Sequence, residues 1–190
     1  MGAPLISKDE VLNRLTRVFR ENGYGATLSQ LSQNTGLQRA SLYHYFPGGK
    51  EEMATAVVER SNAVLEREII APLHGTGAPS ERLRAMMRSV DRYFAGGTES
   101  CLLGSLTHTP GTHRFESHIK AGFTAWIDAI ASVLTEAGLT RRTARVRAQN
   151  AVFAIEGALL VCHGIGDTKP FRRMLRELPE QMTAVELSAA

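Results

Sequence analysis

The sequence predicts an all-α protein that consists of a small N-terminal helical unit and a larger C-terminal helical bundle. Apolar residues recur at helical spacing along almost all of the 190 residues, and no stretch shows the strict alternation that a half-buried β-strand requires. Glycine and proline interrupt this pattern often enough to give about nine helices. We place the domain boundary just before a predicted helix that begins near Lys50, which gives domains at residues 1–49 and 50–190.

Composition indicates a globular chain that does not span a membrane. Hydrophobic residues make up 43% of the chain, which is enough for a sizeable core, and the formal net charge is only +3. The most apolar stretch, Ala151 to Cys162, is too short for a membrane span and is interrupted by Glu156. The N-terminal segment MGAPLISKDE lacks the basic and apolar regions of a secretory signal. We therefore expect a cytoplasmic protein with no membrane partner.

Neither the cysteines nor the histidines have the spacing of a metal site. Cys101 and Cys162 are the only cysteines and lie far apart, so buried free thiols are the simpler interpretation and a redox-sensing pair is the alternative. His108, His113 and His118 follow one another in steps of five residues, which would turn their side chains apart on a helix. We expect neither a metal ion nor another cofactor.

A first helix is predicted from about Ser7 to Asn22. Ser7 is a good N-cap, Asp9 and Glu10 lie near the positive end of the helix, and Gly23 stops it. The apolar residues of this helix share one face: Val11, Leu15, Val18 and Phe19. The two short helices that follow can pack on this face, which gives a compact three-helix unit.

The segment from Thr27 to Lys50, TLSQLSQNTGLQRASLYHYFPGGK, predicts a helix-turn-helix. Thr27 can cap a short helix, and Gly36 supplies a sharp turn that a residue with a Cβ would resist. After the turn Leu42 can point inward, and Phe46 is expected in the core. The side chains left facing outward are Gln38, Arg39, Ser41, Tyr43 and His44. A second helix with this face suits the major groove of DNA.

The distribution of charge supports a DNA-binding surface more than the total charge does. No Asp or Glu occurs from Asn22 through Lys50, although Glu21, Glu51 and Glu52 lie just outside this window. A surface that approaches phosphates must avoid carboxylates. The alternative is an ordinary solvated helical hairpin that lacks acids and uses its aromatic residues as core.

A linking helix is predicted over about residues 50–70, and the C-terminal bundle follows Pro72. Its helices are expected around Leu83 to Phe94, over a short piece from Cys101 to Thr107, from about His113 to Ala137, from about Thr140 to His163, and from Asp167 or Thr168 to about Glu186. Pro179 lies inside the last of these helices and is a candidate for a kink.

The last two helices carry more apolar surface than one small bundle can cover. The stretch AVFAIEGALLVC is apolar on nearly all sides, and a helix of this kind needs partners all round. This surplus predicts a homodimer, which would also double the number of DNA contacts. The alternative is that the whole surface is internal core of a single chain.

From residue 5 to about 60 the chain resembles the TetR family of one-component transcriptional repressors. The resemblance is carried by FRENGYGATLSQLSQNTGLQRASLYHYFPGGKEEM, whose Gly-Tyr, Thr, Leu, Gly, Ser-Leu-Tyr, aromatic-Phe and following Lys match the family pattern. The PGG segment makes the spacing from Phe46 to Lys50 one residue longer than is common in the family. With ESCLLGSL, this variant resembles the LmrA/YxaF-like subgroup, some members of which sense flavonoid-type aromatic compounds.

The resemblance implies binding of double-stranded DNA at a palindromic operator, with individual roles for the residues that match. Thr27 and Tyr43 would contact phosphates, and Lys50 would contact the DNA backbone from the start of the linking helix. The residues presented to the groove would be Gln38, Arg39, Ser41 and His44.

The resemblance also implies that the C-terminal bundle binds a small, hydrophobic or aromatic effector that releases the protein from DNA. The candidate pocket residues form a mostly apolar set with one carboxylate: Met87, Phe94, Leu102, Phe123, Trp126, Phe153 and Glu156. Each could instead belong to the core, and a buried Glu156 would need a partner in either case.

Two other classes of function compete with this interpretation. The sequence does not support an enzyme, because it has no nucleophile elbow, no glycine loop that cradles phosphate and no paired carboxylates on one helical face. The second rival is an architectural or protein-binding helical module that uses the N-terminal aromatic residues to hold a partner protein. A footprint on a palindrome would separate these possibilities.

Overall fold

The computed structural model describes residues 6–107 and 111–184, and all regular elements within these ranges are helices. The all-α prediction is therefore confirmed. Contacts divide the chain into two compact units, and the first comprises the residues up to Ala63 together with Cys101–Ala121. The second comprises Val64–Ser100 and the residues from Gly122 onward. The domain boundary predicted between residues 49 and 50 falls inside the first unit and stays a prediction.

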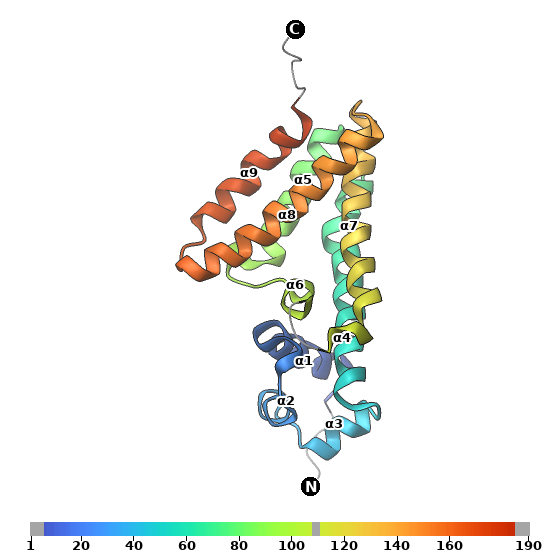
Figure 1. The fold of residues 1–190 in the computed structure, drawn as a ribbon, viewed down its shortest axis with the longest axis vertical. Coiled ribbons are helices and arrows are strands. Elements are labelled where there is room, and N and C mark those ends of the chain that lie inside the picture. Colours follow the sequence, from blue (N-terminus) through green and yellow to red (C-terminus); the bar gives the residue numbers. More distant parts are fainter. Residues whose placement is uncertain (1–5, 108–110, 185–190) are drawn as a thin grey trace. The chain divides into compact units, whose positions relative to one another are not determined.

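The helices follow the predicted order (Figure 1). The first unit contains α1 (Lys8–Asn22), α2 (Leu28–Thr35), α3 (Arg39–Tyr45), α4 (Gly49–Val64) up to Ala63, α6 (Leu102–Thr107) and the start of α7 (Glu116–Glu136). The second unit contains α5 (Pro79–Tyr93), the remainder of α7, α8 (Arg141–Ile165) and α9 (Lys169–Thr183). Short 3-10 turns lie at Gly23–Gly25, Ala71–His74, Ala95–Gly97 and Thr112–Arg114.

Several helix ends differ from the sequence prediction, among them those of α4, α7 and α9. The linking helix does not stay α-helical to residue 70, because Leu65–Ile70 continues α4 as a π-helical turn. Helix α7 begins at Glu116 rather than His113, because Thr112–Arg114 forms a tighter 3-10 turn. Helix α9 ends at Thr183, because Ala184 leaves the helical region with φ −55° and ψ 125°; the predicted end near Glu186 lies outside the described residues.

The core of the first unit is built on α1. The Ser7 side chain accepts a hydrogen bond from the Glu10 amide, so the helix begins where its cap predicts. Four apolar residues of α1 are buried: Val11, Leu15, Val18 and Phe19. They share the core with Leu31 of α2, Leu42 of α3 and Phe46, which was predicted to be buried. Burying each such side chain contributes about 1.5–3 kcal/mol.

The core of the second unit joins α5 and α9 through aromatic contacts. Phe94 and Phe171 meet edge to face, with ring centroids 6.4 Å apart and an interplanar angle of 89°. Gly97 lies beneath this contact with φ 95°, and a Cβ there would come within 2.9 Å of the Phe171 ring. Only glycine combines that backbone conformation with this close approach.

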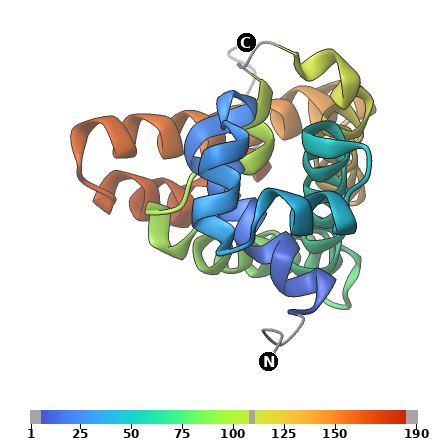
Figure 2. The ribbon, with the colours of Figure 1, turned by 90° about the horizontal axis from the view of Figure 1, so that it is seen from below.

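Helices α8 and α9 lie side by side in both ribbon views (Figures 1 and 2). One face of α8 is buried, and it combines alanines with larger apolar residues: Ala144, Ala148, Ala151, Val152, Ile155, Leu159 and Cys162. The opposite face leaves large apolar side chains exposed, with Phe153 at 64% and Leu160 at 75%. By length and composition α8 would also suit a membrane span, with mean hydropathy 1.3 over its most apolar window. One such helix among the described residues is weak evidence, since the core helix of a soluble protein passes the same test.

Candidate nucleic-acid interface

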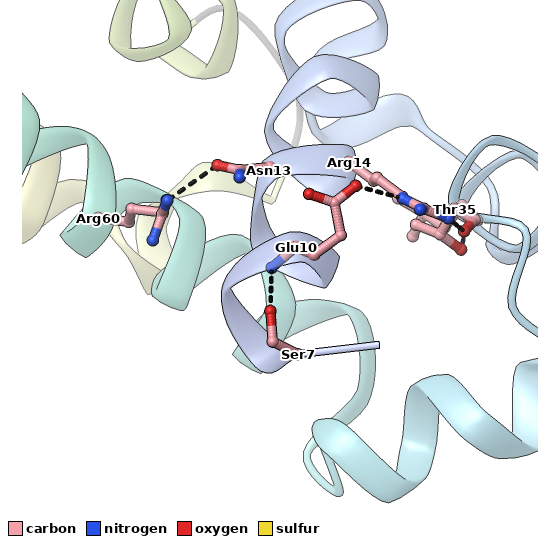
Figure 3. A network of polar contacts seen from close by, with 7 residues as sticks. Ser7, Glu10, Asn13, Arg14, Thr35 and Arg60 are labelled. Atoms are coloured by element: carbon pink, nitrogen blue, oxygen red, sulfur yellow. Dashed lines mark hydrogen bonds and ion pairs between the residues drawn. The ribbon is translucent and has the colours of Figure 1, made fainter. Parts of the chain in front are cut away.

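Helix α1 fixes the position of α2 through Arg14. The Arg14 guanidinium donates to the Glu10 carboxylate at 2.8 Å and to the Thr35 carbonyl at 2.8 Å, at the carboxyl end of α2 (Figure 3). A cation suits this end of a helix, because the last carbonyls have no partner within the helix. Across α1, Arg60 of α4 donates to Asp9 and Asn13. Helices α1, α2 and α4 are thus tied together by polar contacts as well as by their core.

Thr27 begins α2 as predicted, and a complete capping box surrounds it. Its hydroxyl accepts from the Gln30 amide at 3.2 Å, and the Gln30 side chain accepts from the Thr27 amide at 2.8 Å. Thr27 is exposed, so the positive end of α2 faces solvent at this point. An exposed hydroxyl at a helix N-terminus is a suitable place for a phosphate oxygen.

Gly36 makes the turn between α2 and α3. Its φ of 68° and ψ of 15° place it in the left-handed region, where a residue with a Cβ is strained. The Ser32 hydroxyl donates to the Leu37 carbonyl at 2.6 Å and so closes the turn from the other side. This geometry sets the direction in which α3 leaves α2.

Helix α3 buries one residue and exposes most of the others. Leu42 is fully buried, whereas Gln38, Arg39, Tyr43 and His44 are exposed and Ser41 is half-buried. Gln38 is the N-cap, but its side chain makes no capping hydrogen bond. The structure therefore brings five of the predicted DNA-contacting residues together on or beside one short helix.

Two of these side chains are held in place by neighbours. The Arg39 guanidinium donates to the Ser29 hydroxyl of α2, which keeps its long side chain beside the turn. The Tyr43 ring packs over Gly49, because a Cβ at that glycine would lie 3.2 Å from a ring carbon. Tyr43 still exposes 44% of its surface. Side chains that are partly fixed lose less entropy when they bind.

Lys50, unlike a free surface lysine, has its ammonium bound within the first unit. Its ammonium donates to the carbonyls of Tyr24 and Ala26, at 2.9 and 3.3 Å, and lies 4.3 Å from the centroid of the Tyr24 ring. These partners carry no formal charge, so the positive charge remains beside the start of α2. Two of the three N–H groups are used, and Lys50 fastens α4 to the segment before Thr27.

Two of the three carboxylates that border the acid-free window, Glu51 and Glu52, are engaged within the first unit. Glu51 pairs with Arg114, and this hydrogen bond and charge raise the pKa of the Arg114 guanidinium. Glu52 accepts from the Gly48 amide at 2.7 Å at the start of α4. Burial raises the pKa of the Tyr24 phenol, so this ring stays neutral beneath Lys50. Of the acids that border the window, Glu51 is therefore paired with a cation and Glu52 accepts a backbone N–H at the start of α4.

Three residues that support the site were missed by sequence reasoning. Gln30 completes the cap, Ser29 holds Arg39, and Tyr24 receives Lys50. The Thr-x-x-Gln spacing of the capping box was visible in the sequence and could have identified Gln30. The other two act across turns, where local spacing gives no signal.

The predicted effector residues lie in both units. Leu102 is buried in α6 of the first unit, whereas Phe94 and Trp126 are buried in the second, where the indole donates to the Met86 sulfur at 3.4 Å. Phe123 and Glu156 are half-buried, and Phe153 is exposed. Met87 is the member of the set that lines an open groove between α5 and α9.

Family profiles match both the N-terminal and the C-terminal part of the chain. The sequence profile of the bacterial regulatory proteins of the tetR family matches residues 7–57. The profile of the C-terminal domain of LmrA/YxaF-like transcriptional regulators matches residues 79–177, which is more than half of the chain. These two segments correspond to the helix-turn-helix with its supporting α1, and to the helices from α5 to α9.

Individual relatives and solved structures agree with these matches. The chain is 24% identical to the transcriptional regulator LmrA of Bacillus subtilis, and the match covers 92% of this chain and 95% of that protein. A TetR-family regulator of Agrobacterium tumefaciens is 26% identical, with a TM-score of 0.80 and coverage of 93% and 97%. The regulator CifR, solved with a 26-base-pair operator duplex, is 19% identical with a TM-score of 0.75 and coverage of 94% and 98%.

An acid-free helix-turn-helix packed on α1, followed by a helical bundle, defines a DNA-binding transcriptional regulator rather than an enzyme. The chain belongs to the TetR family of bacterial regulators, with a C-terminal domain of the LmrA/YxaF-like kind.

Proposed function

We propose that this regulator is a cytoplasmic repressor that binds a palindromic operator as a homodimer and leaves it when a small hydrophobic or aromatic molecule binds the C-terminal bundle. The observation that carries the proposal is the exposed face of α3, where Gln38, Arg39 and His44 lie on a surface free of carboxylates. Arginine can bind guanine O6 and N7 with two hydrogen bonds, so Arg39 is the residue proposed to read a base.

The phosphate contacts are proposed to surround this helix. The exposed positive end of α2 at Thr27, the Tyr43 hydroxyl and the positive charge of Lys50 each suit a phosphate oxygen. Such contacts position α3 in the groove without reading sequence. Ser41 is half-buried and would reach only the nearest atoms of the duplex.

The homodimer is proposed to form through α8. Its exposed residues Val146, Phe153 and Leu160 follow one another in steps of seven, which places them on one stripe of a helix. Gly157 and Gly164 have open space where a Cβ would be, so a second helix could approach closely. An exposed apolar stripe of this size is costly in water and is typical of an interface.

Effector release requires that the small molecule bind one conformation more tightly than the other. The continuous run from α4 through the π-helical turn at Leu65–Ile70 joins the two units along the chain and is the proposed lever. Of the predicted effector residues in the second unit, Met87, Phe94 and Trp126 are buried and are candidates for contact with the effector.

Selection of bound sequences from a random pool of duplex DNA tests the proposal. We expect an inverted repeat, and we expect Arg39→Ala to relax base preference at one position per half-site by about 1–3 kcal/mol. Ser29→Ala is the matched variant, because it removes only the neighbour that holds Arg39 and should weaken the same preference less. Equal losses on the operator and on random DNA would instead make Arg39 a phosphate contact, and recovery of no common sequence would overturn the proposal.

A further inference from the structure

The groove between α5 and α9 of the second unit is lined by an unusual density of arginine. Five arginines and a single acid, Asp91, surround a cavity of about 510 Å³. The arginines of α5 are Arg84, Arg88 and Arg92, and those of α9 are Arg172 and Arg176. Within each helix they are four residues apart, so they share the side that faces the groove.

The floor of this groove is apolar. Met87, Leu175 and Pro179 line it and are buried, whereas the five arginines are exposed around it. The groove therefore offers an apolar surface beneath a ring of planar cations. Its volume lies within the roughly 300–1,000 Å³ that is usual for small-molecule sites.

Three of the arginines are held by side chains of the second unit. Arg84 lies 3.7 Å from the Glu180 carboxylate, Arg92 donates to the Ser89 hydroxyl at 2.9 Å, and the Arg172 Nε lies 3.9 Å from Asp91. Arg172 also packs on Gly96, because a Cβ there would come within 2.1 Å of its guanidinium. The left-handed φ of 70° and this contact both require glycine at that position.

The other two arginines are available to a ligand. Within residues 6–107 and 111–184, neither Arg88 nor Arg176 has a hydrogen-bond or ion-pair partner. Guanidinium groups repel one another when they are gathered without matching acids, and an anion relieves this repulsion. Their planar N–H groups fit a carboxylate or a phosphate with two hydrogen bonds each.

We infer that this groove binds a small anionic molecule that has an apolar or aromatic body, with its carboxylate or phosphate held between Arg88 and Arg176. The inference deepens the effector part of the proposed function by assigning a charge and a place to the ligand. Direct binding is measured without DNA, so its failure is distinguishable from failure of operator recognition.

Calorimetry with 1-naphthyl phosphate, 1-naphthoate, 1-naphthol and inorganic phosphate tests the inference. We expect the two naphthyl anions to bind at least about tenfold more tightly than 1-naphthol, which lacks the charge, and than inorganic phosphate, which lacks the apolar body. The naphthyl anion with the lower dissociation constant identifies the preferred head group. Binding of 1-naphthol as tight as that of both anions would overturn the inference.

Variants locate the site. Arg88→Gln with Arg176→Gln should raise the dissociation constant of the preferred anion by at least about tenfold, because each removed guanidinium leaves the anion with fewer charge-assisted hydrogen bonds. Arg173→Gln is the control, because it removes one positive charge from α9 outside the groove, as Arg176→Gln does within it, and should change the constant less than about twofold. Equal affinity in the double variant and the wild type would overturn the inference. A second result would also overturn it: neither naphthyl anion binds the wild type, and the double variant loses binding to random duplex DNA. That result would assign the arginines to nucleic acid.

Discussion

Helices α3 and α8 both expose side chains, but the chemistry of the two faces is opposite. α3 exposes Arg39, Tyr43 and His44, which water solvates well, whereas α8 exposes Phe153 and Leu160, which it does not. A polar face can remain open in the free protein and still bind a charged partner. An apolar face of comparable exposure favours permanent coverage. Under the proposed function, this contrast would allow one chain to hold a stable partner through α8 and a reversible partner through α3.

The largest expected effect comes from breaking the apolar face. Phe153→Glu with Leu160→Glu should raise the dissociation constant of the dimer by at least about 100-fold, or about 3 kcal/mol, because two buried contacts would become buried charges. Sedimentation equilibrium measures the change, and operator affinity should fall with it.

The same experiment distinguishes the two faces of α8. Both side chains are exposed in the single chain, so circular dichroism of the double variant should keep its helical signal. Arg141→Glu, in the polar first turn of the same helix, is the control and should leave the dimer intact. A double variant that sediments as the wild type would place the interface elsewhere.

The next effect concerns the turn that aims α3. Gly36→Ala should destabilise the protein by about 1–2 kcal/mol, because alanine is strained at a φ of 68°. The nearest atom to an added Cβ is Arg14 Nη1 at 3.6 Å, an ordinary contact, so the loss is conformational rather than steric. Urea unfolding measures it. Gly36→Asn should lose less, because asparagine tolerates this conformation, and equal losses for both variants would contradict the explanation.

Local signals explain which parts of these regions the sequence could predict. Ser7, Thr27 and Gly36 act on the backbone within three or four residues, and the structure places all three as their types predict. The arginine groove was missed, although the four-residue spacing of its arginines is visible in the sequence. Pairing Arg88 with Arg176 requires α5 and α9 to pack, and no local pattern encodes that.

The predicted effector residues show the same limit. Apolar type identified Phe94 and Trp126 as buried, but it also selected Phe153, which is exposed on α8. Side-chain chemistry alone does not distinguish a residue that faces the core from one that faces a second copy, because both positions favour the same residues. Helix ends at Glu116 and Thr183 were misplaced for a related reason, since a 3-10 turn or an extended residue there has no strong sequence signal.

A smaller effect distinguishes two roles of Lys50, contact with a DNA phosphate and attachment of α4 to the carbonyls of Tyr24 and Ala26. Lys50→Gln should weaken operator binding by about 1 kcal/mol per half-site and reduce the salt dependence by about one charge per half-site, if the ammonium acts on phosphate. Titration of DNA binding against salt concentration measures both quantities. Lys50→Arg keeps the charge and should preserve the slope. Reduced stability with an unchanged slope would show that Lys50 only fastens α4 to the carbonyls of Tyr24 and Ala26.

The smallest expected effect is a pH dependence of the polar contact that ties α2 to α1. The hydrogen bond from Arg14 holds the pKa of the Glu10 carboxyl below its ordinary value, although both side chains are accessible to solvent. A carboxyl whose pKa is lower in the folded state stabilises the fold above its unfolded pKa of about 4.3, and this contribution is lost as the pH falls through the folded pKa. Urea unfolding measures the free energy of unfolding between pH 6 and 3, values that bracket this range. This free energy should fall less steeply with falling pH for Glu10→Gln than for the wild type. Arg14→Gln removes the same pair from the other side and should flatten the profile equally, even though it also loses the bond to the Thr35 carbonyl and is less stable at every pH. An unchanged profile in Glu10→Gln would show that this pair does not contribute to the stability of the polar face.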